Sequence, residues 1–284
     1  MNETTYTLRR NKLLASIEEG VIILSSAPVK TRSNDTEFPY RQNSDFYYLC
    51  GFEESNTLLV LVKTEDTVKS LLFLEAHDEE HALWNGARMG LEKGREHFDV
   101  DEVADIAEYP NRIPELLRDH TALYIDLHDE SPYAIQAQQA GKELCNMRGV
   151  KRHIRAYFDV TTFIRKERLI KTNEEIAVIR KAIELTAKAH HEAMKTCKPG
   201  MVEYQLQASM SYVFLFHGAR FEAYGAIVAG GNNANTLHYV DNRDVLRDGE
   251  LVLIDAACEW ELYASDITRT FPINGKFTAP QREV

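Results

Sequence analysis

Short apolar runs separated by polar turns characterise the first half of the chain. Runs of this kind, rich in valine, isoleucine and leucine, are typical of buried β-strands. They occur at residues 20–24, 57–62, 70–74 and 122–126. The aromatic run at residues 45–49 has a similar pattern, and we predict a strand there as well.

Two helices are predicted in the same half of the chain. Residues 131–144 have Ser131 at the cap position and Pro132 at the first helical position, which favours a helix start. Residues 78–89 predict an amphipathic helix that carries Trp84, for which we expect core packing; the alternative is an exposed anchor at a subunit contact. Mixed strands and helices with short connections predict a layered α/β domain rather than a helical bundle.

The second half of the chain opens with a predicted long helix. Thr172 and Glu175 have the spacing of a capping box, and the Lys-Pro-Gly sequence at residues 198–200 ends the helix. Its apolar positions predict one packed face, and they are Ile176, Ile179, Ile183, Ala187 and Met194. The further elements predicted here are a helix at residues 203–217 and strands at residues 226–229 and 237–240.

A β-hairpin is predicted near the end of the chain, and it carries two aspartates. One apolar run ends on Asp255 and the next, at residues 262–271, contains Asp266. A turn centred on Trp260 and Glu261 would place the two aspartates directly opposite each other, with Cβ atoms about 4.5–5.5 Å apart. Two carboxylates that close repel each other unless a cation lies between them. Divalent ions would resolve the repulsion, whereas aspartates that face water or cap turns are the other interpretation.

Composition restricts the classes of protein that fit. The chain has 284 residues, enough for two domains, with 44% hydrophobic and 27% charged residues, the balance of a soluble protein. The net charge of −11 argues against nucleic acid or an anionic membrane as partner. No apolar run approaches the roughly 20 residues of a membrane span, and the start lacks a secretory signal. Four scattered cysteines are expected to be reduced, so we predict a cytoplasmic location.

The segment at residues 227–277 resembles the catalytic domain of the Xaa-Pro aminopeptidases (aminopeptidase P), which are pita-bread metallopeptidases. Its most specific pattern is LIDA followed by SDITRTFP, and the resemblance continues upstream through HGARFEAY, TNEEIAVIRKA, HALWNGARMG and FPYRQNSDFYYLCGF. The resemblance implies an α/β domain with a mixed sheet and flanking helices at residues 1–157. A basic connector would follow at residues 158–171. The first half of an α+β pita-bread domain (creatinase/aminopeptidase-like) would occupy residues 172–284.

The resemblance also implies roles for individual residues. Asp255 and Asp266 would bind two divalent metal ions, Mn²⁺ first and Co²⁺ as an alternative, which act on the scissile carbonyl. His238 would be a catalytic residue that binds substrate and supports the tetrahedral intermediate, and Tyr224 would bind substrate nearby. Independently of the resemblance, two-residue alternation puts Thr268 on the face of Asp266, where it would hold the Asp266 carboxylate. From the residues alone, His238 as a loop histidine and Tyr224 as a packed core tyrosine remain alternatives.

The remaining ligands that the resemblance implies, one histidine and two glutamates, have no counterpart in this sequence. No histidine follows His238, and Glu283 is the one glutamate after Asp266. A second capping box, Thr278 to Gln281, begins a helix that stops at Val284. We therefore expect the chain to be an inactive fragment of a longer enzyme.

The complete enzyme is expected to release an N-terminal residue that precedes proline, since an Xaa-Pro bond lacks an amide hydrogen and needs a dedicated pocket. The resemblance implies peptides with proline in second position as partners, and a homo-oligomer, dimer or tetramer. Two alternatives stay open: a prolidase that takes only dipeptides, and a pita-bread protein that has lost catalysis and serves as a binding module.

Overall fold

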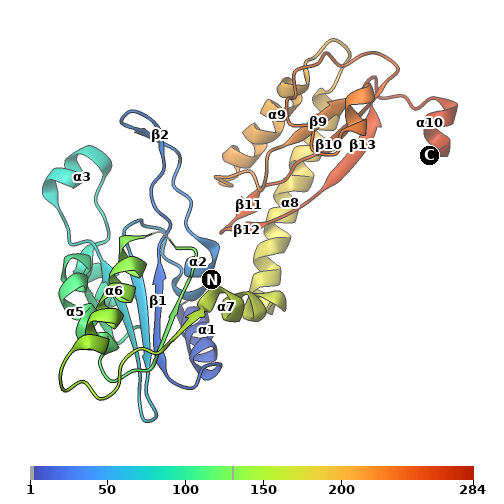
Figure 1. Cartoon of the computed structure of the whole chain (residues 1–284). Coiled ribbons are helices and arrows are strands. Elements are labelled where there is room, and N and C mark those ends of the chain that lie inside the picture. The colour runs from blue at the N-terminus through green and yellow to red at the C-terminus, as the bar shows by residue number, and fades with distance from the viewer. Residues whose placement is uncertain (1–2, 130) are drawn as a thin grey trace. The chain divides into compact units, whose positions relative to one another are not determined.

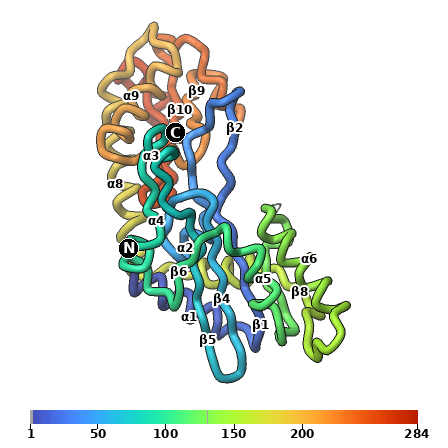
Figure 2. The backbone as a smooth tube through the Cα atoms, turned by 90° about the vertical axis from the view of Figure 1, so that its left-hand side faces the viewer, coloured from blue at the N-terminus to red at the C-terminus, as the bar shows by residue number. Residues whose placement is uncertain are grey.

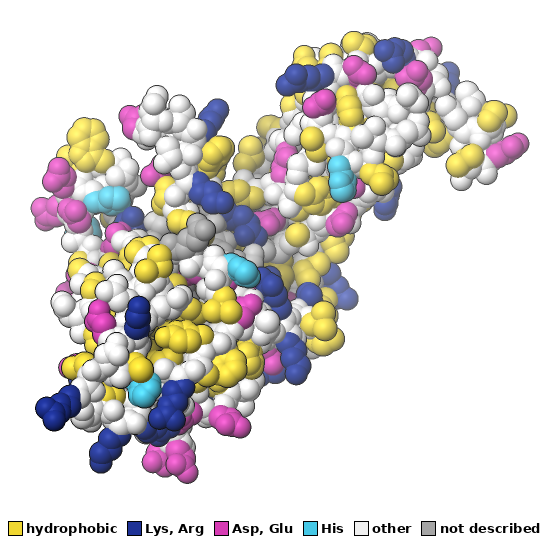
Figure 3. All heavy atoms as spheres, viewed as in Figure 1, with side chains coloured by type: hydrophobic (Ala, Val, Ile, Leu, Met, Phe, Trp, Pro, Cys, Tyr) yellow, Lys and Arg dark blue, Asp and Glu magenta, His cyan; other side chains and the backbone are white. Residues whose placement is uncertain are grey.

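The computed structural model describes residues 3–129 and 131–284. The chain divides into two compact units, residues 1–170 and residues 171–284, and each is described by itself. Within the described residues, every helix is too short or too polar to cross a bilayer. On the face shown in Figure 3, basic and acidic side chains are interspersed over both units.

The first unit is built around a six-stranded mixed sheet with strand order β6-β5-β4-β1-β7-β8. Its strands, with those of a separate two-stranded arm (β2 and β3), are β1 Gly20–Ser25, β2 Thr31–Ser33, β3 Thr36–Glu37, β4 Leu58–Lys63, β5 Val68–Leu74, β6 Glu102–Asp105, β7 Ala122–Ile125 and β8 Ala156–Asp159. Its helices are α1 Glu3–Ala15, α2 Ser44–Cys50, α3 Glu79–Asn85, α4 Gly90–His97, the 3₁₀ turn η1 Ile106–Glu108, α5 Tyr109–Leu117, α6 Pro132–Asn146 and α7 Val160–Leu169. The strands predicted at 20–24, 57–62, 70–74 and 122–126 and the helix starting after Ser131 are confirmed.

Both faces of the six-stranded sheet are buried, which explains its continuous apolar runs. Strand β1 sends Ile22 and Leu24 into a core shared with α1, α2 and α7, and sends Val21 and Ile23 into a core shared with α5 and α6. The helices flank the sheet on its two sides (Figure 1). The arm formed by β2 and β3 stands clear of the sheet (Figure 2), and its residues are exposed. The first unit is thus the layered α/β domain that the sequence predicts.

The strand predicted at residues 45–49 is wrong, because this segment is the helix α2. The Asn43 side chain accepts hydrogen bonds from the backbone N–H groups of Asp45 and Phe46, which starts the helix. Gly51 ends it in the left-handed conformation, with φ of 67°. The aromatic residues are buried in one core of the sheet. The capping signals on either side of the run therefore outweigh its strand-like composition.

The expectation that Trp84 packs in the core is also wrong. Trp84 is 78% exposed and its neighbour Leu83 is 80% exposed. The predicted helix at 78–89 is shorter than expected: α3 ends before Gly86, which has φ of 89°, and contains no buried residue. Because Trp84 is exposed, the alternative interpretation, an anchor at a subunit contact, stays a prediction.

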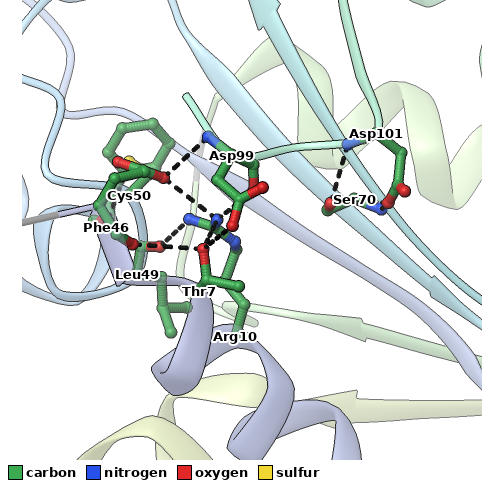
Figure 4. A network of polar contacts seen from close by, with 9 residues as sticks. Thr7, Arg10, Phe46, Leu49, Cys50, Ser70, Asp99 and Asp101 are labelled. Carbon is green, nitrogen blue, oxygen red and sulfur yellow. Dashed lines mark hydrogen bonds and ion pairs between the residues drawn. The ribbon is translucent and has the colours of Figure 1, made fainter. Parts of the chain in front are cut away.

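The buried side chain of Arg10 links three segments of the first unit. Its Nη1 donates to the Leu49 carbonyl at 2.9 Å, and its Nη2 donates to the Asp99 carbonyl at 2.6 Å and to Thr7 Oγ1 at 2.9 Å. Figure 4 shows these contacts converging on the guanidinium group. Helix α1 is thereby joined to the end of α2 and to the loop after α4. Arg10 is only 2% exposed, so these polar partners replace water around the guanidinium group.

The segment at residues 158–171, expected to be a connector, contains the end of β8 and the helix α7. The Asp159 side chain caps α7 by accepting from the Thr161 backbone N–H. Val160 and Ile164 are fully buried in the core of the first unit. Most of this segment is therefore folded, because Val160 and Ile164 pack into the core of the sheet.

The second unit packs two helices on a three-stranded antiparallel sheet of order β13-β10-β9. Its elements are α8 Asn173–Thr196, α9 Glu203–Phe216, β9 Ile227–Gly230, the 3₁₀ turn η2 Gly231–Asn235, β10 Leu251–Asp255, β11 Glu259–Trp260, β12 Tyr263–Ala264, β13 Thr268–Pro272 and α10 Ala279–Glu283. Both predicted capping boxes, at Thr172 and at Thr278, are formed. The strand predicted at residues 237–240 is wrong, since those residues form a turn and irregular chain.

The buried face of α8 differs from the predicted one. Ile176, Ile183 and Met194 are exposed by 36%, 42% and 39%. The residues of α8 that are buried are Glu175, Ala182, Leu185, Thr186, Ala189, His190 and Ala193. The helix therefore turns a face of small and polar side chains, rather than its isoleucines, toward the hairpin of the second unit.

Candidate metal site

The predicted hairpin is present, but its register differs from the prediction. The chain reverses at Glu261 and Leu262, which have φ of 46° and 61°, and the flanking residues Trp260 and Tyr263 are paired. Positive φ at both central residues is the geometry that matches the twist of a two-residue hairpin. Asp255 consequently pairs with Thr268, and the predicted direct pairing of Asp255 with Asp266 is wrong.

The shift amounts to two residues, so both aspartates still point to one face of the hairpin. Val252 and Ile254 of β10 are fully buried in the core formed with α8 and α9. Side chains alternate along a strand, so Asp255 lies on the face turned away from those helices. Asp266 follows the same alternation from Thr268 and becomes the diagonal neighbour of Asp255.

The hydroxyl of Tyr224 joins the two carboxylates. It lies within hydrogen-bonding distance of Asp255 Oδ1 and 3.1 Å from Asp266 Oδ1. The loop before β9 holds Tyr224 in place, because the Ala223 backbone N–H donates to the Ala257 carbonyl at 2.8 Å. Burial and the two carboxylates raise the pKa of Tyr224, so its hydroxyl remains a donor at neutral pH. The predicted proximity of the two aspartates is confirmed.

The two carboxylates fit a divalent cation by their chemistry and their convergence. Both present oxygen atoms to a single point, the Tyr224 hydroxyl oxygen, and carboxylate oxygen suits Mg²⁺, Mn²⁺ and similar hard ions. Over residues 3–129 and 131–284, no three histidine, cysteine or acidic side chains form a cluster able to hold a metal ion. The candidate site on this chain therefore offers two carboxylates, those of Asp255 and Asp266.

His238, the third predicted site residue, is exposed on the loop between η2 and β10. The described residues show no hydrogen bond that joins its imidazole to Asp255, Asp266 or Tyr224. Its neighbour Tyr239 is anchored, since the Tyr239 hydroxyl donates to Glu203 Oε2 at 2.8 Å. The role of His238 toward substrate stays a prediction.

Glu203, at the start of α9, organises this loop and was not predicted. Its carboxylate is fully buried and accepts four hydrogen bonds. The donors are the Gly230 N–H at 2.8 Å, Asn233 Nδ2 at 3.0 Å, the Tyr239 hydroxyl at 2.8 Å and the Asp244 N–H at 2.9 Å. Glutamate is common in the first turn of helices for electrostatic reasons, so nothing in the sequence marks this one as buried.

Comparison with known proteins gives one family-model match in each unit. Residues 6–124 match the family model described as aminopeptidase P, N-terminal domain, and residues 177–284 match metallopeptidase family M24. The chain is similar to the Xaa-Pro aminopeptidase of Escherichia coli (strain K12), with 42% identity over 282 residues. That match covers 97% of this chain and 63% of the relative.

Solved structures give the same result. Aminopeptidase P from E. coli with the inhibitor Pro-Leu has a TM-score of 0.94 and 39% identity, over 100% of this chain and 65% of that one. Proline aminopeptidase P II from Yersinia pestis has a TM-score of 0.92 and 43% identity, over 99% and 65%. The chain thus spans somewhat less than two thirds of the length of these relatives. It carries the N-terminal domain of the aminopeptidase P type and part of a pita-bread domain of metallopeptidase family M24, and over its length it is similar to aminopeptidase P.

Proposed function

We propose that this chain is part of a metal-dependent aminopeptidase that hydrolyses the N-terminal Xaa-Pro bond of peptides. In this proposal Asp255 and Asp266 are ligands of two divalent ions, Mn²⁺ in the native enzyme, with Co²⁺ as a substitute. The observation that supports it is the convergence of both carboxylates on the Tyr224 hydroxyl, on the face of the hairpin turned away from α8 and α9. Asp255 is half-buried and Asp266 is exposed, and two carboxylates held this close repel each other unless a cation binds between them.

The chain's own residues have distinct parts in this proposal. Bound divalent ions supply Lewis acidity and lower the pKa of a water molecule. Asp255 and Asp266 would fix the positions of these ions, and Tyr224 orients both carboxylates by hydrogen bonding. His238 offers an imidazole donor for the substrate carbonyl from the loop that Glu203 anchors. We propose Tyr224 and His238 as the substrate-side residues.

The substrate class follows from the relatives, which are Xaa-Pro aminopeptidases by name, and this favours an aminopeptidase over a prolidase. We propose peptides with proline in second position as substrates. Two ligands do not make the complete centre, so we expect residues 1–284 alone to be inactive. We also propose a homo-oligomer and a cytoplasmic location. All four cysteines are free and two of them are buried, which suits a reducing compartment.

A Mn²⁺ titration of the purified chain tests the proposed ligands. The electron paramagnetic resonance signal of free Mn²⁺ should fall as the chain is added, and Asp255→Asn and Asp266→Asn should each reduce the binding by tenfold or more, about the cost of losing a ligand or its support. Asp241→Asn is the matched control, because Asp241 is exposed and lies in the same unit. Binding that is absent, or equal in all four proteins, would refute the assignment.

A further inference from the structure

Helix α8 places two buried polar side chains directly beneath the candidate metal site. Thr186 is 0% exposed and His190 is 2% exposed. Residues four positions apart lie on the same face of a helix, one turn from each other. Both face the stretch of the hairpin between the regular strand pairs, where residues 256–258 run beside residues 265–267.

Thr186 ties together the two sides of the hairpin. Its Oγ1 accepts from the Cys258 backbone N–H at 3.1 Å and lies 2.8 Å from Ser265 Oγ. Ser265 Oγ in turn donates to the Cys258 carbonyl at 2.9 Å. The Thr186 hydroxyl therefore donates to Ser265, and the three groups satisfy one another. Ser265 precedes Asp266 in the chain, so this contact fixes the backbone that carries the second carboxylate.

His190 makes the corresponding contact for the first carboxylate. Its Nε2 lies 3.0 Å from the carbonyl oxygen of Ala256, the residue after Asp255. A carbonyl oxygen can only accept, so Nε2 carries a proton and donates to it. Burial lowers the pKa of His190, which favours the neutral form. Helix α8 thus bonds the residue next to each aspartate, through the backbone carbonyl of Ala256 and through the side-chain hydroxyl of Ser265.

We propose that Thr186 and His190 are positioning residues for the metal site. This inference rests on the proposed function of Asp255 and Asp266. The regular ladder of β10 and β13 ends at the pair of Asp255 and Thr268. Beyond it, two backbone hydrogen bonds cross the hairpin, from Ala256 N–H to the Ile267 carbonyl at 3.3 Å and from Ser265 N–H to the Cys258 carbonyl at 3.1 Å. The two hydrogen-bonding side chains of α8 add a further restraint on this stretch from the opposite side of the hairpin. Metal ligands depend on such supporting contacts for their orientation.

Mn²⁺ affinity of the full chain is the test, with paired variants at Thr186. Thr186→Val keeps the shape and loses the hydroxyl, so it should weaken Mn²⁺ binding about tenfold, the lower end of the effect of supporting contacts. Thr186→Ser keeps the hydroxyl and should bind Mn²⁺ close to the wild-type value. Thr196→Val is the control, because the Thr196 hydroxyl bonds only to carbonyls of its own helix. Circular dichroism verifies that each variant is folded at the temperature of the titration.

Histidine variants repeat the comparison if Thr186→Val fails to fold. Glutamine can place a donor near the position of Nε2, so His190→Gln should retain binding, whereas His190→Leu should weaken it as Thr186→Val does. If the wild type binds Mn²⁺ through Asp255 and Asp266 while Thr186→Val and His190→Leu bind equally well, the positioning role is refuted and the proposed function stands. If the wild type does not bind Mn²⁺, both are refuted.

Discussion

Replacing Glu203 by alanine is expected to lower the local stability of the second unit by about 3–5 kcal/mol, because four donors lose their buried acceptor. Two of those donors are the backbone N–H groups of Gly230 and Asp244. The Tyr239 hydroxyl loses its partner as well, so the loop bearing His238 should become mobile. Hydrogen exchange of the amides of β9 and β10 in the full chain measures the loss.

Glu184→Ala is the control for this prediction. Glu184 is exposed on α8 and pairs with Lys188 at 2.9 Å, and an exposed pair of this kind contributes little to stability. If Glu203→Ala proves no more destabilising than Glu184→Ala, the four hydrogen bonds do not hold the loop, and its anchoring must come from elsewhere.

Replacing Arg10 by methionine is expected to lower the stability of the first unit by about 2–4 kcal/mol, because methionine fills the volume but leaves two backbone carbonyls, one of them buried, without their donor. The carbonyls concerned belong to Leu49 and Asp99, which Arg10 joins to α1. Urea denaturation of the full chain, followed by the fluorescence of tyrosine and tryptophan, measures the change.

Lys12→Met on the same helix provides the comparison for Arg10. Lys12 is 66% exposed and forms an ion pair with Glu167, so its replacement should change the stability by less than about 1 kcal/mol. Equal effects at Arg10 and Lys12 would show that the buried network in Figure 4 contributes no more than a surface contact.

The strands of the first unit are predictable because both faces of the sheet are covered. Burial on two sides requires continuous apolar runs, and these runs are visible at β1, β4, β5 and β7. The helix α2 is missed because it too is buried almost all round. Its aromatic run therefore cannot be told from a buried strand by periodicity. The Asn43 cap and the glycine at position 51 are the signals that identify it.

The hairpin register is missed because its turn uses unusual residues. Glu261 and Leu262 both have positive φ, where glycine, asparagine and aspartate are the expected residues. Nothing in the local sequence therefore marks that pair as the turn. The two aspartates are nevertheless close together, as predicted, because a register shift of two residues leaves each side chain on the same face of the hairpin.

The buried face of α8 is missed because hydrophobicity does not reveal a polar partner elsewhere in the chain. Thr186 and His190 are buried where the hairpin supplies backbone groups to bond with, while Ile176 and Ile183 remain exposed. Glu203 is missed in the same way, since its four donors come from a loop more than 25 residues later. The acidic pair is thus predictable from the local pattern, and its supports require the tertiary contacts.

The position of a bound ion tests the metal site most directly. Anomalous scattering at the manganese edge, from crystals of the chain soaked in MnCl₂, should show a peak within coordination distance of a carboxylate oxygen of both Asp255 and Asp266, beside the Tyr224 hydroxyl. Density that places the two carboxylates on opposite faces of the hairpin, or manganese peaks found only elsewhere on the surface, would contradict a metal site formed by this pair.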